Sequence, residues 1–331
     1  AVRLAVVMRR NAKRSPVSVE VVPFDDRADP NQAVHAANLI AADPRFVAVI
    51  GHYNSGCAIA ASRVYSQASL AMISPSATNP QLTLRQLEPG WPRRNIFRMT
   101  PTDEVQGSFA AEYAVEAGFR RFILVQDGTP YGKGIAQVFQ SRLEALGGKV
   151  ARVEEVSLGQ RDFSLILQRA KSAKPQALYC AGLYPECGLL LLQARKAGLE
   201  TPFFSGDGSR TEGFLQIAGD RAEGALLTAL GATLDSTGPA ADFVAAFKRR
   251  YPGSEIKAYD PFAYDAAGLL LTALERAGPE RSRVLQALRS TRHWGAVGLT
   301  AFDDKGDTRL RSVRMMRVEK GRFVTLRTAS P

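Results

Sequence analysis

The chain has 331 residues, 45% of them hydrophobic, so it can bury a substantial core and is long for a single domain. Its formal charge of +11 comes from 43 basic and 32 acidic residues, but the basic residues are scattered and no nucleic-acid-binding module accompanies them. No apolar run reaches the roughly 18 residues that a transmembrane helix needs. We therefore expect a basic globular surface, with neither a nucleic-acid partner nor a membrane span.

The first element has two interpretations. Val2–Met8 is either a strand that leads into a basic linker, Arg9–Pro16, or the end of an amphipathic helix. The spacing of Ala5, Met8 and Ala12 is helical, which favours the second interpretation.

A strand and a helix follow. Val17–Val22 is rich in β-branched residues and is predicted to be a strand that leads to Asp25 and Asp26. Asp29–Pro30 then supplies an N-cap and a first-turn proline, so a helix is expected to begin there.

The stretch from Val47 to Thr78 has the pattern of a β-α-β unit. One apolar run stops at Gly51, a helix starts near Ser55, and a second apolar run stops at Ser74. Ligands of open parallel sheets bind outside the carboxyl ends of the strands, and the amino terminus of a helix suits an anion. Ser55 at the helix start, with Ser76 and Thr78 after the second strand, therefore forms a candidate carboxylate cradle.

Strands and helices alternate through most of the remaining chain, which predicts parallel α/β sheets. The spacing indicates two such sheets, with a break near Thr100. The expected strands are 96–100, 121–125, 150–156, 177–180, 203–205, 299–302, 312–318 and 322–326, and the expected helices are 101–117, one that ends at 146, 162–173, 185–197, 240–250, 259–277 and 279–289.

The three cysteines are Cys57, Cys180 and Cys187. Cys180 and Cys187 flank a predicted strand-loop-helix turn and are near enough to meet, but nothing in the sequence requires it. We expect all three to be buried free thiols.

The sequence favours neither a metal site nor catalysis. The three histidines are isolated, and Asp303, Asp304 and Asp307 lack the spacing of a calcium loop, so a β-turn around Lys305–Gly306 is expected instead. There is no nucleophile–base pair at plausible spacing, no nucleophile elbow, no dinucleotide fingerprint and no phosphate loop. We therefore expect no enzyme activity, no catalytic residues, no metal and no cofactor.

Nine segments have a spacing that is found together in one family. They are Asp25–Val34, Val49–His52, Met72–Pro80, Tyr131–Gly134, Asp162–Ser164, Tyr184–Glu186, Gln193–Leu199, Ala222–Gly224 and Phe302–Asp307. Each alone is a weak match, but all nine keep their order across nearly the whole chain. Together they resemble the leucine/isoleucine/valine-binding proteins of ABC transporters, which have the type I periplasmic binding fold.

The resemblance implies an α/β fold of two Rossmann-like lobes with parallel sheets. Lobe 1 would comprise residues 1–101 and 231–308, and lobe 2 residues 102–230 and 309–331, with three crossovers that form the hinge. The family begins with a strand, a loop that lines the side-chain pocket, and a helix. Because the sequence is too short at its start to hold all three, we expect the first element or elements of lobe 1 to be missing.

The resemblance also assigns a ligand site. Ser55 and Thr78 match the residues that hold the ligand's carboxylate, and Ser76, Thr78 and Asp207 match those that meet its ammonium group. Tyr131 matches a tyrosine that lies over the ligand. Further candidates for the side-chain end of the pocket are Tyr53, Asn54, Leu183, Tyr184 and Tyr259.

Two departures from the family pattern affect the site. Asp207 is one carbon shorter than the glutamate of branched-chain amino acid binders, so the cleft would close more tightly or the amine would sit differently. A cysteine pair that is frequent in the subfamily is also absent, because Ala28 and Asn54 stand at those positions.

The expected function is capture of a branched-chain or similar apolar amino acid by lobe closure, for delivery to the membrane subunits of an ABC transporter. Such a protein is periplasmic, and its signal peptide is not in this chain. The alternative is a ligand-sensing domain of the same fold that binds an amide, a urea derivative or an aromatic acid. The resemblance names neither the ligand nor the oligomeric state.

Overall fold

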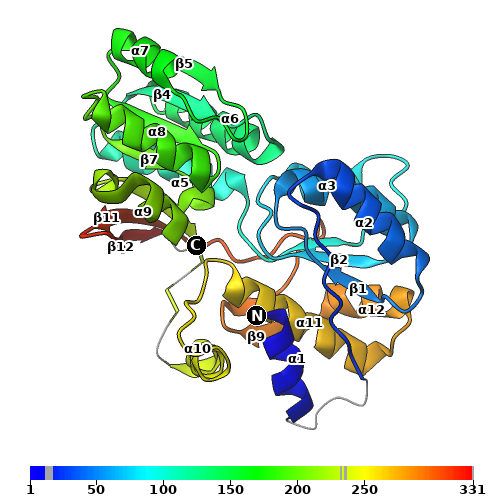
Figure 1. Ribbon diagram of the computed structural model, residues 1–331. Coiled ribbons are helices and arrows are strands. Elements are labelled where there is room, and N and C mark those ends of the chain that lie inside the picture. Colours follow the sequence, from blue (N-terminus) through cyan, green and yellow to red (C-terminus); the bar gives the residue numbers. More distant parts are fainter. Residues whose placement is uncertain (12–17, 232, 235–236, 330–331) are drawn as a thin grey trace. The chain divides into compact units, whose positions relative to one another are not determined.

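The computed structural model describes residues 1–11, 18–231, 233–234 and 237–329. The chain forms two compact units: unit 1 comprises Ala1–Pro101 and Gly231–Leu310, and unit 2 comprises Thr102–Leu230 and Arg311–Pro331. The polypeptide passes from one unit to the other three times. Each unit has a β-sheet of its own with helices packed against it (Figure 1).

Unit 1 is built on a three-stranded parallel sheet in the order β1-β2-β3. One face is covered by α2 and α3, whose small side chains pack with Leu70, Met72 and Ile96 in a buried cluster, and α11 and α12 pack on the other face (Figure 1). The elements of unit 1 are α1 (Val2–Asn11), α2 (Pro30–Ala42), β1 (Ala48–Ile50), α3 (Ser55–Gln67), β2 (Ala71–Ser74), α4 (Gln81–Leu84), η1 (Arg85–Leu87), β3 (Ile96–Arg98), α10 (Gly238–Arg250), α11 (Asp260–Ala277), α12 (Arg281–Ser290), β9 (His293–Gly295) and β10 (Gly298–Thr300).

Unit 2 contains a seven-stranded sheet in the order β12-β11-β8-β7-β6-β4-β5. The five strands from β8 to β5 are parallel, and β11 pairs antiparallel with both β8 and β12. The elements of unit 2 are α5 (Asp103–Glu116), β4 (Arg121–Gln126), α6 (Pro130–Ala145), β5 (Lys149–Glu155), α7 (Ser164–Ala173), β6 (Ala177–Ala181), α8 (Tyr184–Lys196), β7 (Phe203–Ser205), η2 (Asp207–Ser209), α9 (Glu212–Ala218), η3 (Gly219–Ala222), β8 (Leu226–Leu230), β11 (Val313–Glu319) and β12 (Arg322–Ala329).

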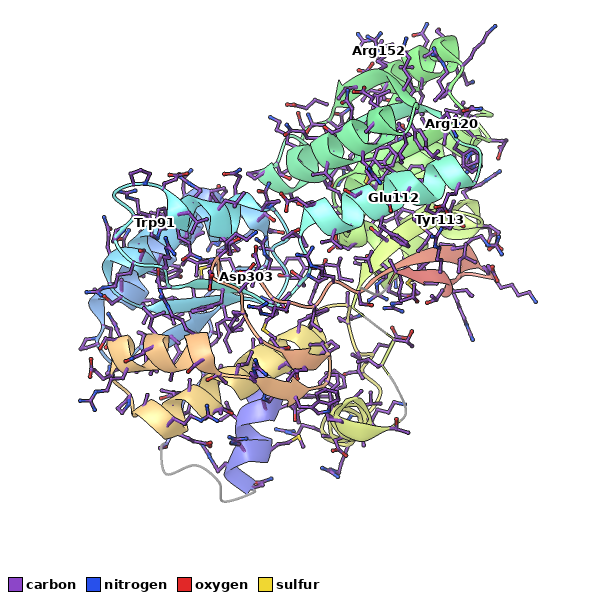
Figure 2. The ribbon with its side chains drawn as sticks, turned by 180° about the vertical axis from the view of Figure 1, so that it is seen from behind. Trp91, Glu112, Tyr113, Arg120, Arg152 and Asp303 are labelled. Carbon is purple, nitrogen blue, oxygen red and sulfur yellow. A yellow bond between two sulfur atoms is a disulfide. The ribbon has the colours of Figure 1, made fainter. Side chains whose placement is uncertain are left out.

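Helices α5 and α6 of unit 2 pack closely because α5 has a glycine at their contact. A Cβ atom on Gly107 would lie 2.9 Å from a side-chain carbon of Val138. Farther along the same two helices, Glu112 of α5 forms a 2.6 Å ion pair with Arg142 of α6. Figure 2 marks Glu112. Gln106 lies on α5 and Tyr131 on α6, so both contacts join the two helices that carry these residues.

The beginning of the chain confirms one expectation and overturns another. Val2–Asn11 is helical, as the spacing of its apolar residues indicated. Residues 18–22 contain no strand, so the strand predicted over Val17–Val22 is wrong; Val17 itself and residues 12–16 of the predicted linker lie outside the described part of the chain.

The physical reason is the lack of a pairing partner. A cavity of about 460 Å³ is lined by residues 20–26 and by β1, and no described strand pairs with residues 18–26. Among the described strands, β1 therefore pairs with β2 alone. β-branched composition favours an extended backbone, but a strand also needs a neighbour.

The cysteine expectation is wrong for two of the three residues. Cys180, in β6, and Cys187, in α8, form a disulfide, with their Cα atoms 5.8 Å apart. The tight turn between β6 and α8 brings the first turn of the helix beside the end of the strand. The seven-residue separation of the two cysteines does not by itself predict this contact. Cys57 is free and buried, and burial raises the pKa of its thiol to about 12.

Among the described helices, none is long and apolar enough to cross a membrane.

Candidate functional site

The candidate residues of unit 1 gather at the amino terminus of α3. The first bond of the helix ladder runs from the Ala58 amide to the Asn54 carbonyl (2.9 Å), so the amides of residues 55–57 precede the ladder. Asn54 is the N-cap residue, but its side chain makes no capping hydrogen bond. Unpaired helix-start amides combined with the helix dipole make this end suited to a carboxylate.

The turn after β2 lies beside this helix start. Ser55 Oγ accepts a hydrogen bond from the Asn79 amide (3.3 Å), and Ser76 Oγ donates to the Tyr53 carbonyl (2.8 Å). Ser74 stabilises the turn from inside, since its hydroxyl accepts from the Ala77 amide (3.0 Å). The predicted residues Ser55 and Ser76 are thus part of one connected structure.

Thr78 is the exceptional residue of this turn. Its side chain is 1% exposed, and its hydroxyl oxygen has no hydrogen-bond partner among the described residues. A buried hydroxyl without a partner costs free energy, of the order of 1–3 kcal/mol. Such an atom is accounted for if it pairs with a ligand.

A buried histidine fixes the end of β1 next to this turn. His52 Nδ1 lies 2.6 Å from an Asp26 carboxylate oxygen, and its Nε2 lies 3.0 Å from the Tyr65 hydroxyl. The hydrogen bond to His52 lowers the pKa of the Asp26 carboxyl, with further help from the Ala28 amide. The carbonyl of His52 in turn accepts from the hydroxyl of Ser74, so this cluster joins the turn after β2.

The candidate residues of unit 2 are centred on Asp207, which follows β7 and is 4% exposed. One of its carboxylate oxygens accepts from the Tyr131 hydroxyl and from the Gln106 amide, both at 2.8 Å. Gly206 and Gly208 allow this approach, because a Cβ atom on either would lie 2.8 Å or less from the Tyr131 ring or hydroxyl. The two predicted unit 2 residues, Tyr131 and Asp207, are therefore in direct contact.

A second carboxylate adjoins Asp207, and the sequence analysis did not include it. The Gln106 amide nitrogen also donates to Asp103 Oδ1 (2.8 Å), and its amide oxygen accepts from Thr228 (2.9 Å). Asp103 is fully buried. Two carboxylates bridged by one amide form an acidic site, and burial beside them raises the pKa of Tyr179 well above its ordinary value. The only signal for this arrangement in the sequence is weak: an acid and an amide three residues apart at a helix start.

The additional candidates are divided between the units. In unit 1, the rings of Tyr53 and Tyr259 meet edge to face with centroids 5.3 Å apart, and Asn54 lies next to Tyr53. In unit 2, Leu183 and Tyr184 lie at the start of α8, where Tyr184 packs over Gly213. Their contact with a ligand remains a prediction, as it does for the five principal residues.

A protein-family model described as "Periplasmic binding protein" matches residues 11–322. The chain belongs to the periplasmic binding protein family. This confirms the resemblance and the two-lobed α/β fold class that were inferred from the nine segments. It also places the chain in a family of solute-binding proteins.

Relatives of this periplasmic binding protein include proteins that are named for the amino acids they bind. This chain is 36% identical over 302 residues to the Leu/Ile/Val-binding protein homolog 1 of Brucella abortus. The match covers 90% of this chain and 78% of the relative. The chain is 35% identical over 292 residues to the leucine-, isoleucine-, valine-, threonine- and alanine-binding protein of Pseudomonas aeruginosa, covering 87% and 76%.

A solved structure is also similar. The branched-chain amino acid transporter substrate-binding protein LivJ from Streptococcus pneumoniae, in complex with isoleucine, superposes with a TM-score of 0.89. The two are 27% identical, and the match covers 100% of this chain and 93% of that one.

Proposed function

We propose that this periplasmic binding protein captures an aliphatic amino acid of the leucine, isoleucine or valine type and delivers it to the membrane subunits of an ABC transporter. The observation that carries the proposal is the buried hydroxyl of Thr78, which has no partner among the described residues and adjoins the amides at the start of α3. This arrangement suits a carboxylate. The names of the relatives from Brucella abortus and Pseudomonas aeruginosa support an amino acid as its source.

The proposal assigns a role to each part of the site. Ser55 and Thr78 bind the carboxylate, with Ser76 contributing a backbone carbonyl to the ammonium group. Asp207 supplies the negative charge for that ammonium, and Tyr131 holds the Asp207 carboxylate through a 2.8 Å hydrogen bond.

The mechanism needs binding energy only, so we propose that the protein is not an enzyme. Charge-assisted hydrogen bonds contribute about 1.5–3 kcal/mol each. A few of them, together with burial of an aliphatic side chain, reach the roughly −8 kcal/mol of micromolar binding. We also propose a periplasmic location, which the Cys180–Cys187 disulfide supports because disulfides persist in oxidising compartments.

Calorimetric titration of L-leucine, L-isoleucine, L-valine and L-alanine tests the function. 4-Methylpentanoate, which is leucine without its amine, is the comparison ligand. We expect micromolar or tighter binding of the branched amino acids and at least 100-fold weaker binding of 4-methylpentanoate. Failure of every amino acid to bind would contradict the proposal, and tight binding of acids without an amine would favour the sensing alternative.

Replacement of the acid tests its assigned role. Asp207→Asn is expected to weaken leucine binding about 100-fold, or about 3 kcal/mol, and to leave 4-methylpentanoate binding almost unchanged. Asp220→Asn, an exposed acid of the same unit, is the matched control. Equal losses for the two ligands would remove Asp207 from the ammonium site.

A further inference from the structure

The side chain of Arg98 is the largest in the described chain that is completely buried. Arg98 is the last residue of β3, and the two residues before it in the strand are apolar. A guanidinium group carries five N–H donors and cannot lose its charge inside a protein. The cost of burying it must therefore be met by its hydrogen-bond partners.

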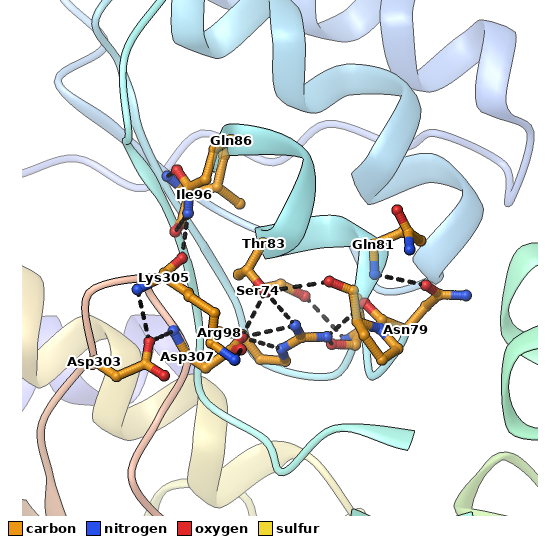
Figure 3. A network of polar contacts seen from close by, with 12 residues as sticks. Ser74, Asn79, Gln81, Thr83, Gln86, Ile96, Arg98, Asp303, Lys305 and Asp307 are labelled. Carbon is orange, nitrogen blue, oxygen red and sulfur yellow. Dashed lines mark hydrogen bonds and ion pairs between the residues drawn. The ribbon is translucent and has the colours of Figure 1, made fainter. Parts of the chain in front are cut away.

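All five donors have an acceptor, and the acceptors come from three separate segments (Figure 3). Nε donates to Asp307 (2.9 Å), and Nη2 donates to Asp307 (2.7 Å) and to the Thr83 hydroxyl (2.6 Å). Nη1 donates to the backbone carbonyls of Ala77 (3.3 Å) and Asn79 (2.7 Å). Nε and Nη2 thus bind the side chains of Asp307 and Thr83, whereas Nη1 binds the backbone of one turn.

The two carbonyls are those that flank Thr78. Arg98 holds the residue before it and the residue after it, while Thr78 itself keeps its hydroxyl without a partner in the described chain. The Asn79 amide is fixed as well, because it donates to Ser55 Oγ at 3.3 Å. The backbone at Thr78 is therefore anchored on one side to Arg98 and on the other to the start of α3.

Asp307 is itself held in place. It forms a β-bridge with Arg98, and its amide donates to Asp303 Oδ1 at 2.9 Å. Gly306 adopts a φ of +89°, and a Cβ atom there would lie 2.1 Å from the Ile96 carbonyl, so the loop approaches β3 as closely as it does only with glycine. Gln86 closes the same loop by donating to the carbonyls of Ile96 (2.8 Å) and Lys305.

We propose that the Arg98–Asp307 pair positions the Thr78 hydroxyl and the neighbouring backbone for the ligand's carboxylate. This inference rests on the proposed function and adds a positioning residue that does not itself touch the ligand. Because Asp307 balances the charge of Arg98 at hydrogen-bond distance, Arg98 acts through geometry and contributes little electrostatic attraction. The cradle is thereby formed before the ligand arrives, so binding does not have to order it.

Arg98→Lys tests the proposal because it keeps the charge and removes the planar set of donors. We expect its affinity for L-leucine to fall 10- to 30-fold by calorimetry. Amide hydrogen exchange, measured by mass spectrometry on a peptide that spans residues 75–80, should be at least fivefold faster without ligand. A purely structural role would lower the melting temperature and leave the affinity of the folded protein unchanged.

Arg281→Lys is the matched control. Arg281 also donates to backbone carbonyls of unit 1, namely those of Ala41, Asp43, Phe46 and Ala68, which lie outside the Thr78 turn. We expect it to lower the melting temperature while leaving leucine affinity within twofold of the parent and exchange over residues 75–80 unchanged. Equal affinity losses in the two variants would overturn the proposal.

Asp307→Asn provides a second variant that keeps a hydrogen-bond acceptor for Arg98 if Arg98→Lys does not fold. The positioning role predicts three- to tenfold weaker leucine binding, because Arg98 is held less firmly. If Arg98 acted through its charge, loss of the compensating acid would strengthen the binding of a carboxylate. Tighter binding, or no change, would therefore overturn the proposal. Absence of leucine binding by the parent protein would instead contradict the proposed function.

Discussion

The two units are stabilised in different ways. Unit 1 has a sheet of three strands and contains the buried Arg98–Asp307 ion pair and the buried carboxyl of Asp265. Unit 2 has a sheet of seven strands and the Cys180–Cys187 cross-link. The comparison teaches that both units bury carboxyl groups, whereas among the described residues only unit 2 has a disulfide, so the stability of unit 2 alone depends on the oxidation state of its thiols.

The two tryptophans allow these dependences to be measured separately. Trp91, which Figure 2 marks, and Trp294 both belong to unit 1 and are the only tryptophans in the sequence. Tryptophan fluorescence therefore follows the unfolding of unit 1, and far-UV circular dichroism follows both units. The predictions below use this difference, from the largest expected effect to the smallest.

The strongest test of unit 1 is the titration of Asp265. Burial raises the pKa of its carboxyl to about 6, although the amides of Ala296 and Val297 oppose the shift. The folded protein keeps a proton that the unfolded chain releases near pH 4, so this group's contribution is complete below pH 4 and is lost as pH rises to 6. A shift of about 2 pH units corresponds to about 3 kcal/mol.

Asp265→Asn should remove this dependence. Urea unfolding followed by tryptophan fluorescence is the measurement, and the stability difference between parent and variant should change by about 3 kcal/mol between pH 3 and pH 7.5. The control is Asp162→Asn, an exposed acid of unit 2. A difference that stays constant over this interval would contradict the prediction.

Cys180→Ala combined with Cys187→Ala tests the cross-link of unit 2. A loop of this length contributes about 2.5 kcal/mol by restricting the unfolded chain. The transition followed by circular dichroism should therefore move to lower urea concentration, while the tryptophan transition stays in place. Cys57→Ala is the control, and movement of both transitions together would show that the units unfold as one.

Thr78→Val sharpens the comparison at the site. Loss of the hydroxyl should weaken leucine binding about 10- to 30-fold, or about 1.5–2 kcal/mol. The stability of the unliganded protein should be unchanged or higher, because a buried hydroxyl without a partner is removed. Thr78→Ser should retain most of the affinity, and calorimetry with urea unfolding measures both properties. A stability loss larger than the affinity loss would assign Thr78 a structural role.

Tyr131→Phe is expected to have the smallest effect. It removes the hydroxyl that donates to Asp207 and accepts from the Gly208 amide at 3.0 Å. Asp207 keeps its hydrogen bond from Gln106, so we expect about a fivefold loss of leucine affinity, or about 1 kcal/mol. A loss as large as that of Asp207→Asn would mean that Tyr131 binds the ligand directly.

The sequence predicted the regular elements well where periodicity was clear. The helices at Tyr184–Lys196, Asp260–Ala277 and Arg281–Ser290 begin and end within two residues of the expected positions, because N-terminal signals and apolar spacing are local properties. Val17–Val22 was predicted wrongly because strand formation also requires a neighbouring strand, which local composition does not report.

The site was predictable only in part. The residue types at Thr78 and Asp207 indicated the chemistry, but the interactions that hold them join distant segments. Arg98 and Asp307 are 209 residues apart, and Gln106 and Asp207 are 101 residues apart. No periodicity or turn signal carries such pairings, so the positioning network became visible only in the folded chain.

The unpaired side of β1 has a consequence for the behaviour of concentrated solutions. Among the described strands it bonds to β2 alone, and the cavity of about 460 Å³ lies along its other side. Backbone donors and acceptors on such an edge are able to template the addition of an extended polypeptide from a neighbouring molecule. Because residues 20–26 bound the same cavity, strand addition at Ala48–Ile50 would first have to displace them, so this segment protects the edge from self-association.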